Sequence, residues 1–294
     1  MSLKERLSPE RIEKVKKRFL QVEHLPTISS TFDKIINMID QESTTIREIE
    51  QIIKLDQAIT IRVLKIINSP FYGYSDVTTI SKAIVLLGFK ELKNIVVSAA
   101  IINVLDARQP IAGLKVSDFW LHSMAVAFIS RFLAKNLDLS CEQESFTIGL
   151  LHDIGKVAYL KEDPQLMGDL MTLAKSRQIS FAQAEEIVGL SHSQVGWYLG
   201  EKWNLPERLC GTIRQHHQPD PESVYFIETA MVHLADHIAV KLQIGNSGNA
   251  CADPLDPAAL HSLKLNDQLV SKILDRIEEK KDALVQVAKN LLSN

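Results

Sequence analysis

The chain has 294 residues, of which 46% are hydrophobic and 23% are charged, and its formal net charge is −3. This length allows one large domain or two medium ones, and the composition is that of a globular protein with a substantial core. Because the small negative charge creates no long-range attraction to nucleic acid or to an anionic membrane, we expect neither as a direct partner.

In the N-terminal part of the chain, apolar side chains recur at spacings of three and four, which is the period of an amphipathic helix. The helices predicted from this pattern cover about 9–22, 28–39, 46–53, 57–67, 79–88 and 90–105. The segment from Asn68 to Tyr74 is predicted to be a turn, because Pro70 cannot continue a helix. Its aromatic residues can either form a ligand surface or anchor the turn to the core.

A linker is predicted from Gln109 to Gly113, where proline and glycine lie close together. We therefore expect an N-terminal helical subdomain at residues 1–110 and a second subdomain at residues 111–294. Helical periodicity and cap-like residues continue through the second one. The helices predicted there cover about 117–136, 142–161, 163–176, 180–188, 192–203, 206–216, 223–242 and 267–292, with a loop at 244–255. Since no segment alternates as a strand does, the predicted fold is all-α.

The cysteines and the N-terminal residues predict the cellular compartment of the protein. Cys141, Cys210 and Cys251 are odd in number and far apart, which predicts no disulfide framework and suits a reducing environment. The N-terminus lacks the apolar core of a signal peptide, and no apolar run is long enough to span a bilayer. We therefore expect a cytoplasmic protein that does not contact a membrane.

Histidine is concentrated in the second half of the chain: seven of the nine histidines lie between positions 122 and 237. Within this region, the segment from Gly149 to Lys156 places His152 directly beside Asp153. Adjacent side chains on a helix point about 100° apart, so this pair can share a metal ion only if other segments complete its ligands.

Two donor sets follow from this concentration, because helical proteins build metal sites from side chains on several helices. The first set is His122, His152, Asp153 and Asp236, and the second is His192, His216 and His217, with Asp153 as a bridge. Imidazole and carboxylate donors suit iron, manganese, nickel, cobalt or zinc, so we predict one or two divalent transition-metal ions. Two such ions can hold a phosphoryl group between them and activate water for hydrolysis.

Other polar residues in the region have a simpler interpretation. A lone histidine in a helix is usually exposed or hydrogen-bonded in the core, and we expect this for His24, His237 and His261. His233 lies three residues before Asp236, so it can be a ligand, a supporting residue or only a neighbour.

These residues, taken together, resemble a known family. The order of His122, His152-Asp153 and Asp236 looks like the HD superfamily of metal-dependent phosphohydrolases, and the remaining motifs are similar to its HDOD branch, the HD-related output domains of bacterial signalling proteins. The motifs are Leu25-Pro26, Asp56, Asn68-Ser69-Pro70, Leu87-Gly88, Phe119-Trp120-Leu121-His122-Ser123, Gly149 to Lys156, His192 with Gly196, Trp203-Asn204-Leu205-Pro206 and His216-His217.

The resemblance implies an all-helical fold in which an N-terminal helical bundle packs on an HD-like domain. Matched to the related HD-GYP branch of cyclic di-GMP phosphodiesterases, the metal ligands fall on His122, His152, Asp153, His192, His216, His217 and Asp236. The same match implies that Lys156 contacts the phosphate, which makes Asp153 and Lys156 the catalytic candidates, and it adds Asp118 as a further acidic ligand. No Gly-Tyr-Pro segment follows His217, so the match to an enzyme of cyclic di-GMP is incomplete.

Two classes of function remain in view. One is a bacterial regulatory module for signal transduction, whose metal site is structural, vestigial or a sensor of a ligand. The other is an active phosphohydrolase for a nucleotide or cyclic nucleotide. The N-terminal half carries no catalytic candidates, whereas the ligand set is nearly full. We predict the module, with a signalling protein as its partner and a nucleotide or cyclic dinucleotide as a ligand to be tested.

Overall fold

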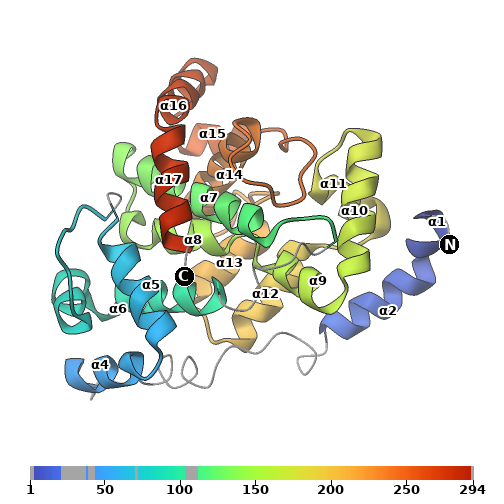
Figure 1. Ribbon diagram of the computed structural model, residues 1–294. Coiled ribbons are helices and arrows are strands. Elements are labelled where there is room, and N and C mark those ends of the chain that lie inside the picture. Colours follow the sequence, from blue (N-terminus) through green and yellow to red (C-terminus); the bar gives the residue numbers. More distant parts are fainter. Residues whose placement is uncertain (1–2, 21–37, 39–43, 70–71, 103–111, 293–294) are drawn as a thin grey trace. The chain divides into compact units, whose positions relative to one another are not determined.

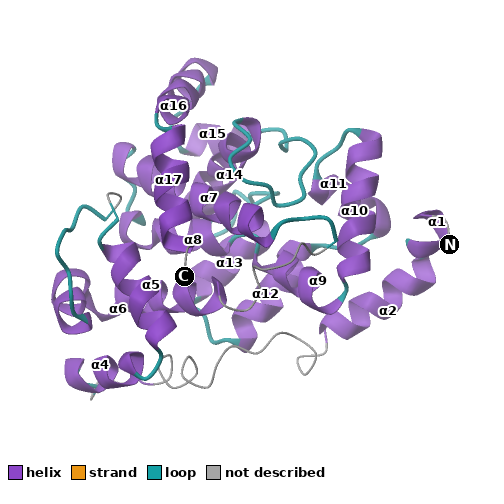
Figure 2. Cartoon of the chain, viewed as in Figure 1, coloured by secondary structure: helices purple, strands orange, loops and turns teal. Residues whose placement is uncertain are grey.

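The computed structural model describes residues 3–20, 38, 44–69, 72–102 and 112–292 (Figure 1). All secondary-structure elements of the described residues are helices, as Figure 2 shows. The predicted all-α fold is therefore confirmed. None of the described helices is both long and apolar enough to cross a membrane.

The chain forms two compact units. The first comprises residues 1–26 and 105–285, and the second comprises residues 27–104 and 286–294. Most of the predicted linker from Gln109 to Gly113 lies outside the described residues, as does the helix predicted at 28–39 apart from Met38. The predicted division at residue 110 stays a prediction.

In the second unit, α4 (Ile46–Lys54), α5 (Gln57–Ile67) and α6 (Ile80–Ile102) pack against one another. Side-chain caps fix the N-termini of the first two helices. Thr45 and Glu48 form a capping box on α4, and Asp56 accepts a hydrogen bond from the first turn of α5. Gly88, at φ 78°, interrupts α6 where the sequence predicts a break.

The turn that begins at Asn68 is held by its own side chains. The Asn68 amide donates to the carbonyls of Leu64 and Val77 and accepts from the Val77 amide. Tyr72 is buried and donates to Glu91 over 2.6 Å. Tyr72 therefore anchors the turn to the core, which is the second of the two interpretations of its aromatic residues.

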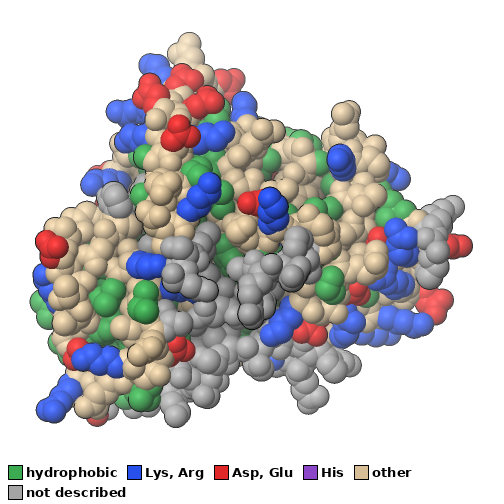
Figure 3. Space-filling model, in the orientation of Figure 1, with side chains coloured by type: hydrophobic (Ala, Val, Ile, Leu, Met, Phe, Trp, Pro, Cys, Tyr) green, Lys and Arg blue, Asp and Glu red, His purple; other side chains and the backbone are tan. Residues whose placement is uncertain are grey.

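The helices of the first unit build the site. They are α1 (Leu3–Arg6), α2 (Pro9–Leu20), α7 (Val116–Asn136), α8 (Glu142–Leu151), α9 (Ile154–Glu162), α10 (Pro164–Arg177), α11 (Phe181–Val188), α12 (His192–Lys202), α13 (Glu207–Gln215), α14 (Phe226–Lys241), α15 (Pro257–Ser262) and α16 (Asp267–Glu279). The last helix, α17 (Lys281–Leu292), begins in this unit. Over α16, acidic and basic side chains are intermingled (Figure 3), in keeping with the small net charge.

Two long helices predicted from periodicity are each divided. The predicted helix at 142–161 is wrong, because α8 ends at Leu151 and α9 begins at Ile154. His152 turns its ring back to the Gly149 carbonyl, and Asp153 leaves the helical backbone at φ −96° and ψ 15°. The predicted helix at 267–292 is likewise α16 and α17, which meet at Lys280, and α15 lies in a stretch without a predicted helix.

Packing brings the site-bearing segments together. α7 is buried along most of its length and packs against α8 and α14, while α12 packs against α9 and α13. The contact of α9 with α12 is close at Gly155, where a Cβ atom would lie 1.8 Å from the His192 carbonyl oxygen. Only glycine allows this approach, and it brings the start of α12 beside the junction of α8 and α9.

Candidate metal centre

All seven predicted ligands lie in the first unit; six are buried, and His217 is of intermediate burial. His122 lies in the middle of α7, His152 and Asp153 form the junction of α8 and α9, and Asp236 lies in α14. His192 is the first residue of α12, and His216-His217 follow α13 directly. The most exposed of these side chains, that of His217, is only 9% accessible.

The first donor set forms what we call the His122 position: His122, His152, Asp153 and Asp236. The His122 Nε2 atom lies 3.0 Å from Asp236 Oδ1 and 3.9 Å from Asp153 Oδ2. The His152 Nε2 atom lies 3.7 Å and 3.5 Å from the same two oxygens. Four donors from three segments thus face one space.

The second set forms what we call the His192 position: Asp153, His192, His216 and His217. The other carboxylate oxygen of Asp153, Oδ1, lies 3.0 Å from His192 Nε2 and 3.7 Å from His216 Nε2. The His217 and His192 Nε2 atoms are 3.0 Å apart. Asp153 therefore presents one oxygen to each position, which is the arrangement of a bridging carboxylate.

Five donor atoms in these two sets are buried without a hydrogen bond. They are His122 Nε2, His152 Nε2, His216 Nε2, Asp153 Oδ1 and Asp236 Oδ1. Leaving a buried polar atom without a hydrogen bond costs about 1–3 kcal/mol. Two of these atoms, His122 Nε2 and Asp236 Oδ1, lie 3.0 Å apart as an ion pair, and bound cations would satisfy all five. Imidazole nitrogen and carboxylate oxygen suit divalent transition metals. The residues fit bound metal ions.

The hydrogen bonds of the Nδ1 atoms determine which ring nitrogen faces the cluster. The Nδ1 atoms of His152 and His216 lie 2.7 Å and 2.8 Å from the Gly149 and Ile213 carbonyl oxygens. Since a carbonyl only accepts, each Nδ1 carries the proton and each Nε2 keeps a lone pair for a metal. Both histidines cap the end of a helix and donate to a carbonyl three residues back.

Burial and the surrounding charges set the protonation of the cluster. Burial would raise the pKa of the Asp153 carboxyl, but the Lys156 ammonium and His152 hold it well below its usual range. Burial opposes the imidazolium form of His192, yet the Glu185 carboxylate raises its pKa to about 9. Burial, followed by the nearby His217, lowers the pKa of His216. The metal-free cluster therefore holds ionised carboxylates and a protonated His192.

The model of the HDOD domain family matches residues 25–219 of this chain. The chain belongs to the HDOD family. A crystal structure of an HDOD domain protein of unknown function from Geobacter sulfurreducens is 26% identical, with a TM-score of 0.72 over 94% of this chain and 99% of that one. The predicted family is confirmed.

Two further relatives match parts of the HDOD protein. A protein of Treponema pallidum is 26% identical over 200 residues, or 67% of this chain and 38% of that protein. Ribonuclease Y of Aquifex aeolicus is 31% identical over 119 residues, or 40% of this chain and 16% of the ribonuclease. The HDOD protein thus spans well under half the length of these two relatives.

Lys156 of the HDOD protein is directed into the cluster. Its Nζ atom lies 2.8 Å from Asp153 Oδ2, 3.4 Å from Ser247 Oγ and 4.8 Å from the centre of the Phe181 ring. The side chain has no accessible surface. Its contact with a phosphate stays a prediction.

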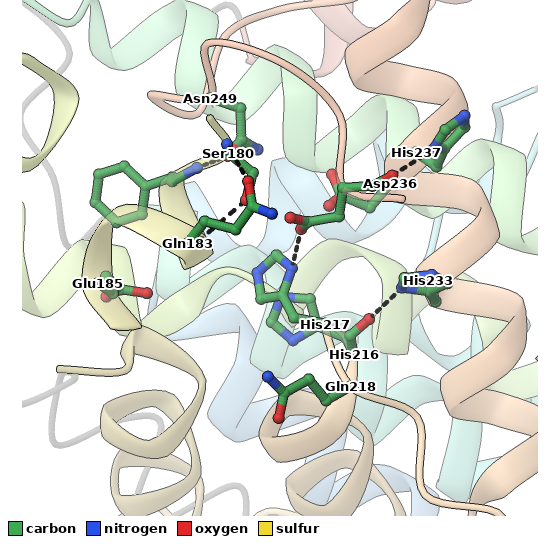
Figure 4. Close-up of polar contacts among 12 residues, drawn as sticks. Ser180, Gln183, Glu185, His216, His217, Gln218, His233, Asp236, His237 and Asn249 are labelled. Atoms are coloured by element: carbon green, nitrogen blue, oxygen red, sulfur yellow. Dashed lines mark hydrogen bonds and ion pairs between the residues drawn. The ribbon is translucent and has the colours of Figure 1, made fainter. Parts of the chain in front are cut away.

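Several polar residues of the region lie outside the two positions. His233 uses both nitrogens, donating from Nδ1 to the His216 carbonyl (Figure 4) and accepting at Nε2 from the Asp256 amide. His237 donates to the Asp253 carbonyl over 2.7 Å. Asp118 is half-buried and belongs to none of the donor groups that the described residues form. His261 is exposed, and His24 lies outside the described residues.

Two acidic residues were missed by the sequence analysis. Glu185, in α11, accepts from both the Nδ1 atom and the backbone amide of His192, over 2.5 Å and 2.7 Å. Asp253, in the loop after α14, accepts from His217 Nδ1 over 2.6 Å. No motif marks either residue, because each meets its histidine only through the folded arrangement of α11, α12 and the loop.

A cavity of about 460 Å³ adjoins the His122 position. Its lining consists of His122, Val240, Lys241 and residues between 243 and 252 of the loop after α14. A polar space of this size accommodates a small ligand. Through His122, the cavity borders the His122 position.

Proposed function

We propose that this HDOD protein is a signal-transduction module whose buried cluster binds two divalent transition-metal ions, and that it acts by binding a signalling protein. One observation carries the metal proposal: five unpaired buried donors face two positions that share Asp153. The candidate ions are iron, manganese, nickel, cobalt and zinc, because all accept mixed nitrogen and oxygen donors.

Enclosure of the site supports a regulatory role over turnover. His152, His192 and His216 have no accessible surface, so a substrate would have to displace protein before reaching them, and His122, which borders the cavity, is only 1% accessible. Lys156 is turned to Asp153 and Ser247 and is equally buried. Ions held in this way stabilise the fold around them, which suits a structural or sensing centre.

A phosphohydrolase is the second candidate, and the cavity beside His122 supports it. In that case the seven ligands would hold the ions, which lower the pKa of a bound water when present. Asp153 would bind both ions, and Lys156 would donate to a phosphate oxygen of a nucleotide or cyclic dinucleotide. Similarity to a ribonuclease over 119 residues also favours this candidate.

Elemental analysis tests the metal centre. We expect purified protein, or protein reconstituted with Mn²⁺, to contain about two ions per chain. The double variant His152→Ala, Asp153→Ala should contain none, because it removes a ligand from each position. Absence of metal in the wild-type protein after reconstitution would refute the centre.

Turnover and partner capture separate the two functions. A module should hydrolyse none of a panel of nucleotides and cyclic dinucleotides when loaded with metal, and a pull-down should recover a signalling partner whether or not metal is bound. Loss of this binding after substitutions between Asn68 and Tyr74 would locate the interface there. Turnover that disappears in the double variant would establish the hydrolase instead. Turnover that survives it would indicate a contaminating enzyme.

A further inference from the structure

The segment 243–256, which follows α14, packs against residues of the proposed metal centre. Its Asn246 amide donates to the Asp118 carbonyl over 2.8 Å, and Asn249 accepts from the backbone amide of Phe181 over 3.2 Å. At Gly245, φ is +72° and a Cβ atom would lie 2.2 Å from the His122 amide nitrogen. The segment is thus fastened to α7 and to the start of α11.

Asp253 is the residue by which this segment reaches the His192 position. Its Oδ2 atom lies 2.6 Å from His217 Nδ1, and its carbonyl accepts from His237 over 2.7 Å. The side chain is 13% accessible, so the pair with His217 is largely shielded from water. Figure 4 shows His217 beside His216, while His233, Asp236 and His237 lie on α14.

A second carboxylate and histidine pair faces this one. Glu185 accepts from His192 Nδ1, and the His192 and His217 Nε2 atoms are 3.0 Å apart. With both Nδ1 atoms committed to carboxylates, two neutral rings would point their lone pairs at each other. Two lone pairs at this distance repel unless a cation lies between or beside them, so the arrangement favours a metal ion or a proton.

We propose that Asp253 is a positioning residue for the metal centre: it fixes His217 as the Nδ1–H tautomer and thereby completes the His192 position. This inference rests on the proposed metal centre and adds a residue to it from outside the segment matched by the family model. Carboxylates that hold a ligating histidine contribute about 10–100-fold to metal affinity. We expect the effect of Asp253 at the His192 position, because its carboxylate holds His217; the same carboxylate also lies near Asp236 of the His122 position.

Titration of the full chain with Mn²⁺, followed by the EPR signal of the free ion, tests the proposal. We expect Asp253→Asn to weaken one of two binding steps by about 10–100-fold and to leave the other unchanged. Asp253→Glu should recover part of the loss, because it restores a carboxylate on the same segment. Asp256→Asn is the matched control: Asp256 caps α15 through Ala259, and asparagine keeps this cap, so both steps should be unchanged.

A second measurement reads the tautomer without metal. In ¹⁵N-histidine spectra of the metal-free protein, His217, assigned with a His217→Gln variant, should be the Nδ1–H form. In Asp253→Asn this signal should shift toward a mixture of tautomers. A general loosening of the fold would not do this selectively, and the thermal midpoint reports such loosening separately.

The outcomes separate the two proposals. A wild-type protein that binds no Mn²⁺ refutes the metal centre. A wild-type protein that binds two ions, with both steps and the His217 tautomer unchanged in Asp253→Asn, refutes the role of Asp253 alone. Asp253, His217 and Asp236 also form a donor group of their own. Three bound ions in the wild type, with one lost in Asp253→Asn, would make Asp253 a ligand and overturn its role as a positioning residue.

Discussion

The two proposed metal positions use similar donors but would balance the charge of a cation in different ways. The His122 position receives a second carboxylate directly, from Asp236 in α14. At the His192 position, Asp153 is the direct carboxylate, and Glu185 and Asp253 lie behind two of the histidines. Beyond the carboxylate of Asp153, which both positions share, the first position gains negative charge from an oxygen donor and the second gains it from carboxylates behind imidazole rings.

This difference should make the two proposed positions respond differently to protons. A direct carboxylate binds a cation whatever the tautomer of the neighbouring rings, whereas a backing carboxylate acts only through the ring that it orients. The His192 position should therefore be the more sensitive of the two to protons and to changes in the surrounding loop. Both positions depend equally on Asp153.

Replacement of Asp153 by asparagine should have the largest effect. It removes the negative charge and one of the two oxygens that Asp153 presents to the two positions, so we expect both ions to be lost in elemental analysis. It also leaves the buried Lys156 ammonium without its counter-charge, and such a loss destabilises a protein by about 3–5 kcal/mol.

Chemical unfolding of the metal-free proteins checks the second part of this prediction. The double variant Asp153→Asn, Lys156→Met should recover much of the lost free energy of unfolding, because it buries no unpaired charge. Retention of two ions by Asp153→Asn would contradict a shared bridge.

The pH dependence of the metal-free protein should be next in size. Folded His192 keeps its proton up to about pH 9, whereas an ordinary histidine loses it near 6.5. The contribution of His192 to the free energy of unfolding is therefore fully present below pH 6.5 and falls toward pH 9, by on the order of 3 kcal/mol. His152, with a raised pKa, adds to this fall. His216, with a lowered pKa, acts only below pH 6.5, where it destabilises.

Urea unfolding in EDTA at several pH values measures this slope. His192→Gln should flatten it between pH 6.5 and 9, while His122→Gln should leave the His192 contribution in place. An equal slope in wild type and His192→Gln would show that another group controls the stability.

The sequence predicts the fold well where local chemistry decides it. The period of apolar residues predicts the course of α7, and α12 begins at His192, as its predicted range does. The break between α8 and α9 escapes prediction, because the hydrogen bond from His152 to the Gly149 carbonyl leaves no mark on the periodicity. That break matters for the site, since it frees His152 and Asp153 from the spacing of a continuous helix.

The donor set was predictable for a different reason. Histidines are few and concentrated, so a search by residue type and family resemblance gathers the ligands that the structure brings together. Acidic residues are many, and Glu185 and Asp253 lie 7 and 36 residues from the histidines that they hold. Only the folded chain distinguishes these two from the others. The roles of the seven ligands and of Lys156 stay predictions until metal is measured.

Replacement of Glu185 by glutamine should weaken the His192 position by about 10–100-fold, as expected for loss of a carboxylate behind a ligating histidine. The effect on the His122 position should be absent. Because Glu185 also raises the pKa of His192, the fall in metal-free stability should move to lower pH. Calorimetric titration with Mn²⁺ and urea unfolding measure these two effects, and weakening of both binding steps would contradict the separation of the positions.

The smallest effect is expected at His237, whose ring touches the segment 243–256 and neither metal position. His237→Ala removes one hydrogen bond, to the Asp253 carbonyl, which typically contributes about 0.5–1.5 kcal/mol to stability. The Asp253 side chain keeps its bond to His217, so Mn²⁺ affinity should fall by no more than a few-fold at the His192 position. His261→Ala, at an exposed site on α15, is the control and should change neither quantity. A loss of affinity in His237→Ala as large as in Asp253→Asn would mean that the backbone of the segment, rather than the Asp253 carboxylate, holds His217 in place.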